Sequence, residues 1–491
     1  MKRLRGKASK QGRNRPSRVS RKTSAPLPLE ELTAISSVDG RYRRISEALA
    51  PYFSEYALIR FRTEVECRYL VALSSARGLG VRRLTDVEKR TLEKLSNISL
   101  EDARLIKQIE REGHDGIPAT NHDVKAIEYF LKRALRGTTL EDTTEWLHFA
   151  LTSEDVNSVA YALAFSAALT EAIIPSFEGI QRELDALATR HGNAAMLART
   201  HGQAASPTTF GKEMMVFSKR LERQLDQLRA MHLSVKWGGA TGNYNAHMAA
   251  APEVDWRSFA RRFVSHLNDG RTVKLELNEF TTQIEPHDSY AEYFDCMRRA
   301  NTILLDFSQD MWRYISDGWI GQRPKAGEVG SSTMPHKVNP IDFENAEGNL
   351  GVANALFEHF SRKLPISRLQ RDLSDSTVER AFGTALAHSL IAHQSLMRGF
   401  GKITVNVSAM RTALMSHPEV LAEAIQTALR RENVAVPYEK LKELTRGKKV
   451  TLRDFAVFID ALDIGKETKK RLKALRPETY TGLAAHLAKG E

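Results

Sequence analysis

Apolar residues recur at three- and four-residue steps through most of the stretch from 140 to 400, the spacing of one face of an α-helix. The residues in these stripes are Phe177, Ile180, Leu184, Leu187, Phe210, Met214, Phe217, Leu221, Leu225, Leu228, Leu304, Phe307, Met311, Ile315, Leu386, Leu390, His393, Leu396 and Phe400. Such stripes are typical of the core of a long-helix bundle, and we give them no role in ligand binding. Strand-like alternation of useful length is absent, although a short strand or hairpin fits at 271–284.

Shorter helical patterns flank this region on both sides. Ahead of it they lie at 52–77, 85–95, 99–111 and 120–129. Asn121 or Thr120 is the expected N-cap of the last of these helices. Behind the bundle, short helical pieces are separated by Pro418, Pro437 and a turn at 446–449.

These patterns predict an all-α protein with three mostly helical domains. We expect an N-terminal helical domain at 29–139, a central long-helix bundle at 140–400 and a C-terminal helical domain at 401–491. A basic tail at 1–28 precedes them and lacks a core pattern, so we expect it to be disordered.

Composition agrees with a soluble globular protein of two or three domains, since 42% of the 491 residues are hydrophobic and 27% are charged. The two cysteines, Cys67 and Cys296, lie in amphipathic helical patterns. We expect them to be reduced core residues of an intracellular protein. The most apolar segment, 160–174, contains Glu171 and is too short to span a membrane.

The net charge of +12 belongs almost entirely to the tail, because residues 1–25 hold ten Lys and Arg residues and no acid, which leaves +2 for the rest. Such a tail fits a nucleic-acid or polyanion contact, an organelle transit peptide or a nuclear signal. Basic runs are most often simply solvated, and that interpretation is favoured here. The expected location is cytoplasmic, with organelle targeting by the tail as the alternative.

One loop, at 323–341, breaks the helical pattern most sharply. It is rich in Gly, Pro and small hydroxyl residues, and Pro335 and Pro340 forbid a continuous helix. A long irregular insert inside a helical domain is usually a lid or binding loop. Its polar side chains, which suit gripping an anion and moving a proton, are Ser331, Ser332, Thr333, His336, Lys337 and Asn339.

Three further polar segments, at 121–123, 152–155 and 199–203, also interrupt the helices. Each has an ordinary structural explanation when taken alone. The Thr-Ser-Glu-Asp run at 152–155 fits a helix cap, His122 with Asp123 fits a surface pair, and His201 fits a turn.

Taken together, the segments resemble the motifs of one enzyme family. The chain contains T-S-E-D-V-N, R-T-H-G-Q, T-T-Q-I-E-P-H-D and G-S-S-T-M-P-H-K-V-N-P in that order. The last closely resembles the signature loop of the fumarase/aspartase superfamily, and His336 points to its adenylosuccinate lyases. The resemblance extends from about residue 30 to 490 and is closest to the longer bacterial-type branch.

The resemblance implies β-elimination of fumarate from two succinylated purine nucleotides, adenylosuccinate and SAICAR, without a metal or organic cofactor. Ser331 resembles the general base and His201 the general acid. A serine can act as a base only if its alkoxide is stabilised, and Lys337 with the loop N–H groups could do this. Spacing alone does not decide between Ser331 and Ser332, and His122 is a further alternative for the base.

The resemblance also implies a substrate-binding set. Arginines suit the phosphate, and the hydroxyl and amide groups suit the succinyl carboxylates. The set is Arg41, Tyr42, Asn121, His122, Asp123, Thr152, Ser153, Gln283, Ser332, Lys337, Asn339, Asn345, Arg371, Ser376 and Arg380.

The family forms homotetramers whose active sites take segments from three subunits, so we expect the helices to assemble into a tetrameric core. Membrane contact is not expected, and nucleic acid would bind only through the tail at 1–25. The nearest alternatives are sister lyases such as argininosuccinate lyase, fumarase, aspartase or a cycloisomerase. Two alternatives come from other classes of protein. One is a structural protein that has lost the catalytic activity of the superfamily, and the other is a polyanion-binding protein.

Overall fold

The computed structural model describes residues 28, 30–323, 334, 337–435, 437–446 and 449–490. The predictions for the tail at 1–27 and for Ser331, Ser332, Thr333 and His336 therefore lie outside the described residues.

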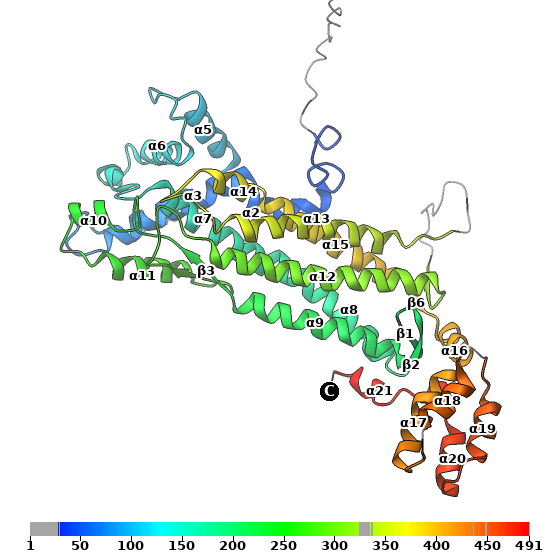
Figure 1. Ribbon diagram of the computed structural model, residues 1–491. Helices are drawn as coiled ribbons and strands as arrows, with labels where there is room; N and C mark the ends of the chain where they lie inside the picture. Colours follow the sequence, from blue (N-terminus) through cyan, green and yellow to red (C-terminus); the bar gives the residue numbers. More distant parts are fainter. Residues whose placement is uncertain are drawn as a thin grey trace, which may run out of the picture.

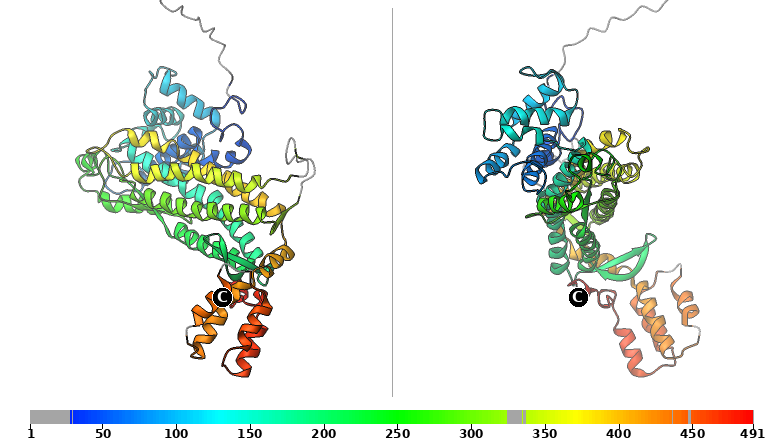
Figure 2. Two further views of the ribbon diagram at one scale, coloured as in Figure 1. Left: turned by 45° about the vertical axis from the view of Figure 1, so that its right-hand side comes forward. Right: turned by 90° about the vertical axis from the view of Figure 1, so that its left-hand side faces the viewer.

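The predicted bundle of long helices forms the body of the molecule (Figure 1). The N-terminal helices lie along one side near one end of the bundle, and the C-terminal helices extend from the other end (Figure 2). The long helices are α7 (Ser153–Ala168), α8 (Ile174–Arg190), α9 (Phe210–Ala230), α12 (Asp288–Ser316), α13 (Ile341–Lys363) and α15 (Phe382–Lys402). The predicted apolar stripes are buried in one continuous core, except that Ile315 is half-buried.

Helices α7 and α8 form one continuous helix, joined by the π-helical turn η3 (Leu169–Ile173). Pro175 sits in the first turn of α8. The combined helix of 38 residues is long and apolar enough to cross a membrane, but 67% of its most apolar window is buried inside the protein. It is therefore a core helix of the bundle.

The N-terminal helices have an apolar cluster of their own, with Leu70, Leu92, Ile106 and Leu131 among its members. These elements are α1 (Arg43–Ser46), η1 (Glu47–Leu49), α2 (Ala50–Phe53), α3 (Glu55–Ser74), α4 (Asp86–Ser96), α5 (Leu100–Arg111), α6 (Asp123–Leu135) and η2 (Glu141–Trp146).

The N-cap expected for α6 was wrong. His122 is the cap, and its Nδ1 accepts the backbone N–H of Lys125 at 3.3 Å. Asn121 precedes the cap with a positive φ of 47°, a conformation that Asn tolerates better than most residues. This turn brings His122, rather than Asn121 or Thr120, to the helix entrance.

The C-terminal helices also enclose a separate apolar cluster, which includes Leu429, Phe455 and Leu472. These elements are α16 (Val407–Met415), η4 (Pro418–Leu421), α17 (Ala422–Arg431), α18 (Pro437–Thr445), α19 (Leu452–Asp460), α20 (Lys466–Ala474), η5 (Pro477–Thr479) and α21 (Ala484–Leu487). The three clusters fit the predicted organisation, while the domain boundaries stay predictions.

The described residues contain more β-strands than predicted, since only one short strand or hairpin was expected. The strands are β1 (Ala195–Thr200), β2 (Gln203–Thr209), β3 (His232–Val235), β4 (Lys274–Leu277), β5 (Ile320–Gln322) and β6 (Ile403–Val405). The segment at 271–284 does contain a strand, β4, which pairs parallel with β3. The antiparallel β1–β2 hairpin was missed, and it extends from the end of the bundle (Figure 2).

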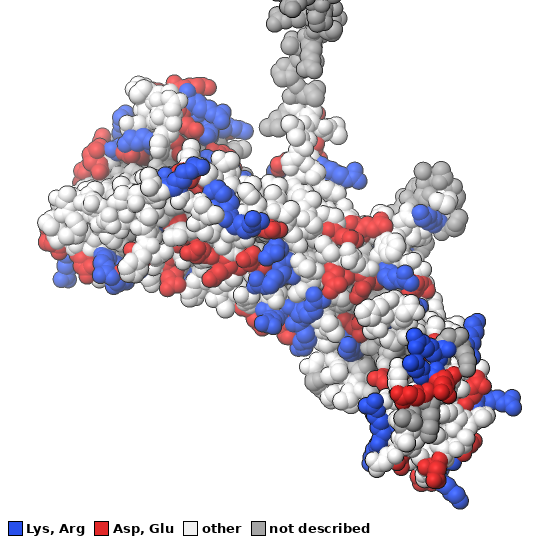
Figure 3. Space-filling model, viewed as in Figure 1, with Lys and Arg blue, Asp and Glu red and all other residues white. Residues whose placement is uncertain are grey.

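Two further predictions were tested by the fold. Cys67 and Cys296 are free and buried, as expected. On the face seen in Figure 3, Lys and Arg are interspersed with Asp and Glu along the bundle, as the low net charge outside the tail predicts.

Candidate active site

One end of the bundle holds a group of buried and half-buried polar side chains, which we call the polar cluster. Five elements meet there: α3, α6, α7, the start of α12 and the short helix α14 (Ser374–Glu379). The members of the polar cluster are Arg62, Asp123, Glu154, Asn157, His287, Arg371, Asp375, Glu379 and Arg380.

Asp123 is held by two arginines. It lies 2.8 Å from the buried Arg62 guanidinium and 3.7 Å from that of Arg380, whose side chain is 46% exposed. Burial alone would raise the pKa of Asp123, but Arg62 and the N–H of Val124 outweigh burial and hold the pKa below its usual value. Asp123 is therefore ionised, and it fixes Arg380 at the surface where an anion could reach it.

His122 and Ser153 are brought together from two helix entrances. The hydroxyl of Ser153 lies 3.3 Å from His122 Nε2. Because Nδ1 of His122 already accepts from Lys125, the neutral ring carries its proton on Nε2 and donates to Ser153. These groups face the N-terminus of α7, where free N–H groups favour an anion.

The neighbouring Thr152 is positioned by a buried ion pair. Its N–H donates to Asp155 Oδ2 at 2.8 Å. Thr152 therefore caps α7, as the ordinary structural explanation of this segment predicted. Asp155 Oδ1 lies 2.6 Å from Lys236 Nζ and also accepts the N–H groups of Gly238 and Gly239. The start of α7 is thereby fixed to the glycine-rich loop after β3.

Arg371 reaches into the polar cluster from the segment between α13 and α14. Its guanidinium lies 3.0 Å from Glu154 and 3.4 Å from Asp375. The same segment contacts the predicted Gln283, whose N–H donates to the carbonyl of Gln370 at 3.3 Å. Ser376, at the start of α14, donates its N–H to Asp375. Gln283 and Ser376, like Thr152 and Ser153, therefore lie next to members of the polar cluster.

Two other predicted residues meet elsewhere. Tyr42 OH accepts from Asn345 Nδ2 at 3.0 Å, and Asn345 Oδ1 accepts from Ser395 of α15 at 2.7 Å. Arg41 lies beside the Tyr42 ring and is exposed. Arg380 precedes α15, and Ser395 lies thirteen residues after Phe382, the first residue of that helix, so this pair is roughly 20 Å along α15 from the polar cluster.

His201 occupies the tip of the β1–β2 hairpin. It is exposed, adopts a positive φ of 52° at the turn, and makes no hydrogen bond with the described residues. Lys337 and Asn339 lie at the described base of the predicted loop. Gln322 of β5 holds this base, because its Nε2 donates to the carbonyl of Val338 at 3.0 Å. Lys337 is exposed as well.

The length of α12 separates these groups. His287 caps the start of α12 beside Glu379, while Tyr314 near its end packs on Phe210 at the base of the hairpin. A helix of 29 residues spans about 43 Å. The chain therefore places His201 near one end of the bundle and the His122–Ser153 pair near the other.

Comparison with known proteins identifies the family. A profile of the family described as "Lyase" matches residues 40–354, and one described as "Adenylosuccinate lyase C-terminal" matches 367–481. The adenylosuccinate lyase of Legionella pneumophila (strain Corby) is 49% identical over 466 residues, covering 94% of this chain and 99% of the relative. That of Escherichia coli K12 is 48% identical, covering 93% of this chain and 98% of the relative. The chain belongs to the adenylosuccinate lyase family.

Adenylosuccinate lyases are carbon–nitrogen lyases of purine biosynthesis, and two solved structures support the shared fold. A fumarate lyase from Mesorhizobium sp. BNC1 has a TM-score of 0.68 at 18% identity, covering 90% of this chain and 97% of the other. The 3-carboxy-cis,cis-muconate lactonizing enzyme of Pseudomonas putida has a TM-score of 0.65 at 19% identity, covering 90% and 95%.

Several members of the polar cluster were not predicted as site residues. Asn157 accepts from Arg62 Nε at 2.8 Å and donates to Glu154 at 2.6 Å, and His287 lies 3.2 Å from Glu379. The sequence signal was Arg62, which lies with Glu66 on an otherwise apolar helical face at 57–73. A buried arginine needs an acidic partner, so Arg62 could have been marked as part of a polar site.

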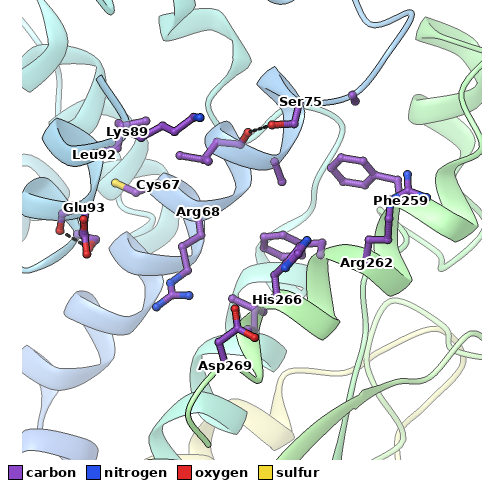
Figure 4. A pocket seen from close by; sticks show the side chains of 16 residues that line it. Cys67, Arg68, Ser75, Lys89, Leu92, Glu93, Phe259, Arg262, His266 and Asp269 are labelled. Carbon is purple, nitrogen blue, oxygen red and sulfur yellow. Dashed lines mark hydrogen bonds between the residues drawn. The ribbon is translucent and has the colours of Figure 1, made fainter. Parts of the chain in front are cut away.

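A well-formed cavity lies away from these groups. Its volume is about 490 Å³, and it opens between α3, α4 and α11 (Trp256–Leu267) (Figure 4). Leu92 and Phe263 form part of its apolar wall, and Arg262 and His266 lie at its rim. Among the predicted site residues that the structure describes, none lines this cavity.

Proposed function

We propose that this chain catalyses the β-elimination of fumarate from adenylosuccinate, giving AMP, and from SAICAR, giving AICAR. The observation that carries the proposal is the 49% identity to an adenylosuccinate lyase over 94% of the chain. Argininosuccinate lyase is the alternative within the superfamily, and the C-terminal family match at 367–481 favours adenylosuccinate lyase over it.

The arginines of the polar cluster suit the phosphate of these nucleotides. Arg380 presents a half-exposed guanidinium that lies 3.7 Å from Asp123, so it keeps capacity for a second anion. Ser153 and the N-terminus of α7 suit a carboxylate or phosphate oxygen next to it. We assign substrate binding to these groups together with His122, Gln283, Arg371 and Ser376.

Acid–base catalysis is assigned to His201 and Ser331. A proton must leave the carbon next to a carboxylate, and the departing nitrogen must receive one. We assign the first step to Ser331, with Lys337 stabilising the negative charge, and the second to His201. The exposed position of His201 at a hairpin tip leaves its ring free to protonate a nitrogen of a substrate held by other elements.

The active site is proposed to be shared between subunits of a homotetramer. His201 and the polar cluster lie at opposite ends of a bundle whose helix α12 spans about 43 Å, whereas a nucleotide is several times shorter. A closed assembly can bring the hairpin of one copy to the polar cluster of another. We place the enzyme in the cytoplasm, with substrates and its own copies as partners.

The test is fumarate release by the purified protein, beside the variants Ser331→Ala and His201→Ala. We expect turnover of adenylosuccinate and SAICAR by the wild type and near-complete loss in both variants. His266→Ala is the matched control, because His266 is an exposed histidine of α11 outside the site. Activity with argininosuccinate but with neither purine substrate would assign the protein to a sister lyase. Full activity in Ser331→Ala would move the base to Ser332 or His122.

A further inference from the structure

Glu154 occupies the centre of the polar cluster, and both of its contacts go to one oxygen. Asn157 Nδ2 donates to Glu154 Oε1 at 2.6 Å, and the Arg371 guanidinium lies 3.0 Å from the same oxygen. Glu154 Oε2 makes no hydrogen bond with a described residue, although the residue is only 4% exposed. One oxygen is therefore available to carry a proton without breaking either contact.

Two carboxylates and one arginine act most directly on Glu154. Asp375 and Glu379 face it from α14, against Arg371 from the preceding segment and His287 from the start of α12. On the side of α3 and α6, Arg62 and Arg380 are paired with Asp123, and the Asn157 side chain stands between Arg62 and Glu154. Tyr161, on the same helix as Glu154, is buried nearby and uncharged.

Burial and the nearby carboxylates make a proton on Glu154 favourable. Burial, followed by the charge of Glu379, raises the pKa of Glu154 to about 7, although Arg371 and Asn157 act in the opposite direction. Burial disfavours a charged His287, but its hydrogen bond to Glu379 and the nearby acids outweigh burial and raise its pKa. At neutral pH the polar cluster is therefore poised between two protonation states.

Arg371 links this equilibrium to the reaction. Its side chain is 17% exposed, and its guanidinium, which contacts Glu154 and Asp375, is one of the groups assigned above to substrate binding. We propose that Glu154 is a positioning residue that restrains Arg371 in the free enzyme and, by taking a proton from solvent when the anionic substrate binds, leaves the Arg371 charge to the substrate. This inference rests on the proposed function, because it takes the ligand to be a purine nucleotide.

Linkage gives the expected pH dependence. The substrate binds best to the form with a protonated Glu154, so KM rises when pH increases through about 7. In Glu154→Gln the amide keeps an oxygen for Asn157 and Arg371 and imitates the protonated acid. The ratio of wild-type KM to Glu154→Gln KM should be near one at pH 6 and about ten at pH 8, with kcat changed less than twofold.

The comparison is made as a ratio because the substrate's own titration affects both proteins equally. Glu88→Gln is the matched control. Glu88, on α4, is another buried glutamate, and it lies 2.8 Å from the guanidinium of Arg82. Its KM should follow the wild type at every pH. A ratio for Glu154→Gln that stays constant between pH 6 and 8 would overturn the proposal, as would an equal pH-dependent change in Glu88→Gln.

A second measurement uses the wild type alone and does not depend on how the variant folds. Calorimetric titration with AMP at pH 8, in two buffers of different ionisation enthalpy, should show uptake of about one proton per site. Zero uptake would overturn the proposal. An enzyme that releases fumarate normally but shows no uptake and a flat KM ratio contradicts this inference alone. One that does not act on adenylosuccinate or SAICAR contradicts the proposed function as well.

Discussion

The two ends of the bundle differ in how far their charged groups are buried and paired. At the polar cluster, charges are buried and paired within one chain, as in the 2.8 Å contact between Arg62 and Asp123. At the other end, His201 and Lys337 are exposed, and His201 makes no hydrogen bond with the described residues. Buried ion pairs fix a geometry because breaking one is costly, whereas exposed groups are restrained little.

This difference suggests separate roles for the two ends, binding at the polar cluster and proton transfer at the hairpin. The polar cluster can hold its shape before any ligand or second chain arrives. The hairpin end presents proton-transferring groups on a short turn, and these groups acquire a defined environment only when something covers them. A shared active site would then combine a preformed binding surface from one copy with a catalytic histidine from another.

The largest expected effect is recovery of activity by mixing two defective proteins. His201→Ala should lose at least about a hundredfold in kcat, the usual contribution of a general acid. Arg380→Ala should lose most activity at low substrate concentration, because a phosphate contact is removed. If each site draws these residues from different copies, randomly mixed oligomers should regain about a quarter of the wild-type sites. Activity no greater than the sum of the two separate variants would place both residues in one chain's site.

The next effect compares one arginine from each end. Arg62→Met leaves Asp123 and Asn157 without a buried partner, so it should lower the free energy of unfolding by about 3–5 kcal/mol. Arg199→Met, at the hairpin, removes an exposed side chain whose contacts are long, 3.4 Å to the Gly202 carbonyl and 5.9 Å to the Trp319 ring, and should cost less than about 0.5 kcal/mol. Urea titration of both variants checks the difference. Equal losses would show that the two ends are stabilised alike.

A third prediction concerns pH and stability at the polar cluster. The raised pKa of Glu154 means that the folded protein holds this proton more tightly than the unfolded chain. Its stabilising contribution is complete below the unfolded pKa of 4.5 and is lost as pH rises through about 7. Between pH 5 and 8 the wild type should therefore lose roughly 3 kcal/mol relative to Glu154→Gln. Unfolding measured across this range would contradict the assignment if the two curves were parallel.

The smallest expected effect is a gain in stability. Histidine is a poor N-cap, and His122 makes only one cap hydrogen bond, at 3.3 Å. Asparagine is among the best caps, so His122→Asn should stabilise the protein by about 0.5–1 kcal/mol while reducing turnover. Thermal unfolding and fumarate release measured on one preparation test both parts. A loss of stability would mean that the contact between His122 and Ser153 contributes more than the cap.

The helical body could be predicted from sequence because its signal is local and repeated. Phe210, Met214 and Phe217 repeat at helical spacing, and all three are buried. The hairpin could not be predicted in this way. Residues 195–209 are rich in Ala and do not alternate, and α16, against which β1 packs, lies about two hundred residues later. Its strands therefore depend on tertiary packing more than on intrinsic preference.

The candidate site was predictable only as far as short motifs extend. Ser153 and Arg371 were found because they lie in recognisable segments of the family. The contact between Arg62 and Asn157 joins residues 95 positions apart, and that between His287 and Glu379 joins residues 92 apart. A pattern along the chain carries no information on such pairings, so the network that positions the binding residues was missed.

The π-helical turn at Leu169–Ile173 has a consequence for reading related sequences. Phe165 packs on Phe382 of α15 at a ring distance of 5.1 Å, and Phe177 packs on His393 at 4.2 Å. Phe165 and Phe177 are twelve residues apart along the helix formed by α7 and α8. Their partners Phe382 and His393 are only eleven residues apart along α15, which is three regular turns. The turn absorbs the extra residue, so a relative with one residue fewer at this point would keep both ends of the helix in contact with α15. Removing a residue elsewhere in the helix would instead rotate one half by about 100° and turn its apolar side away from the core.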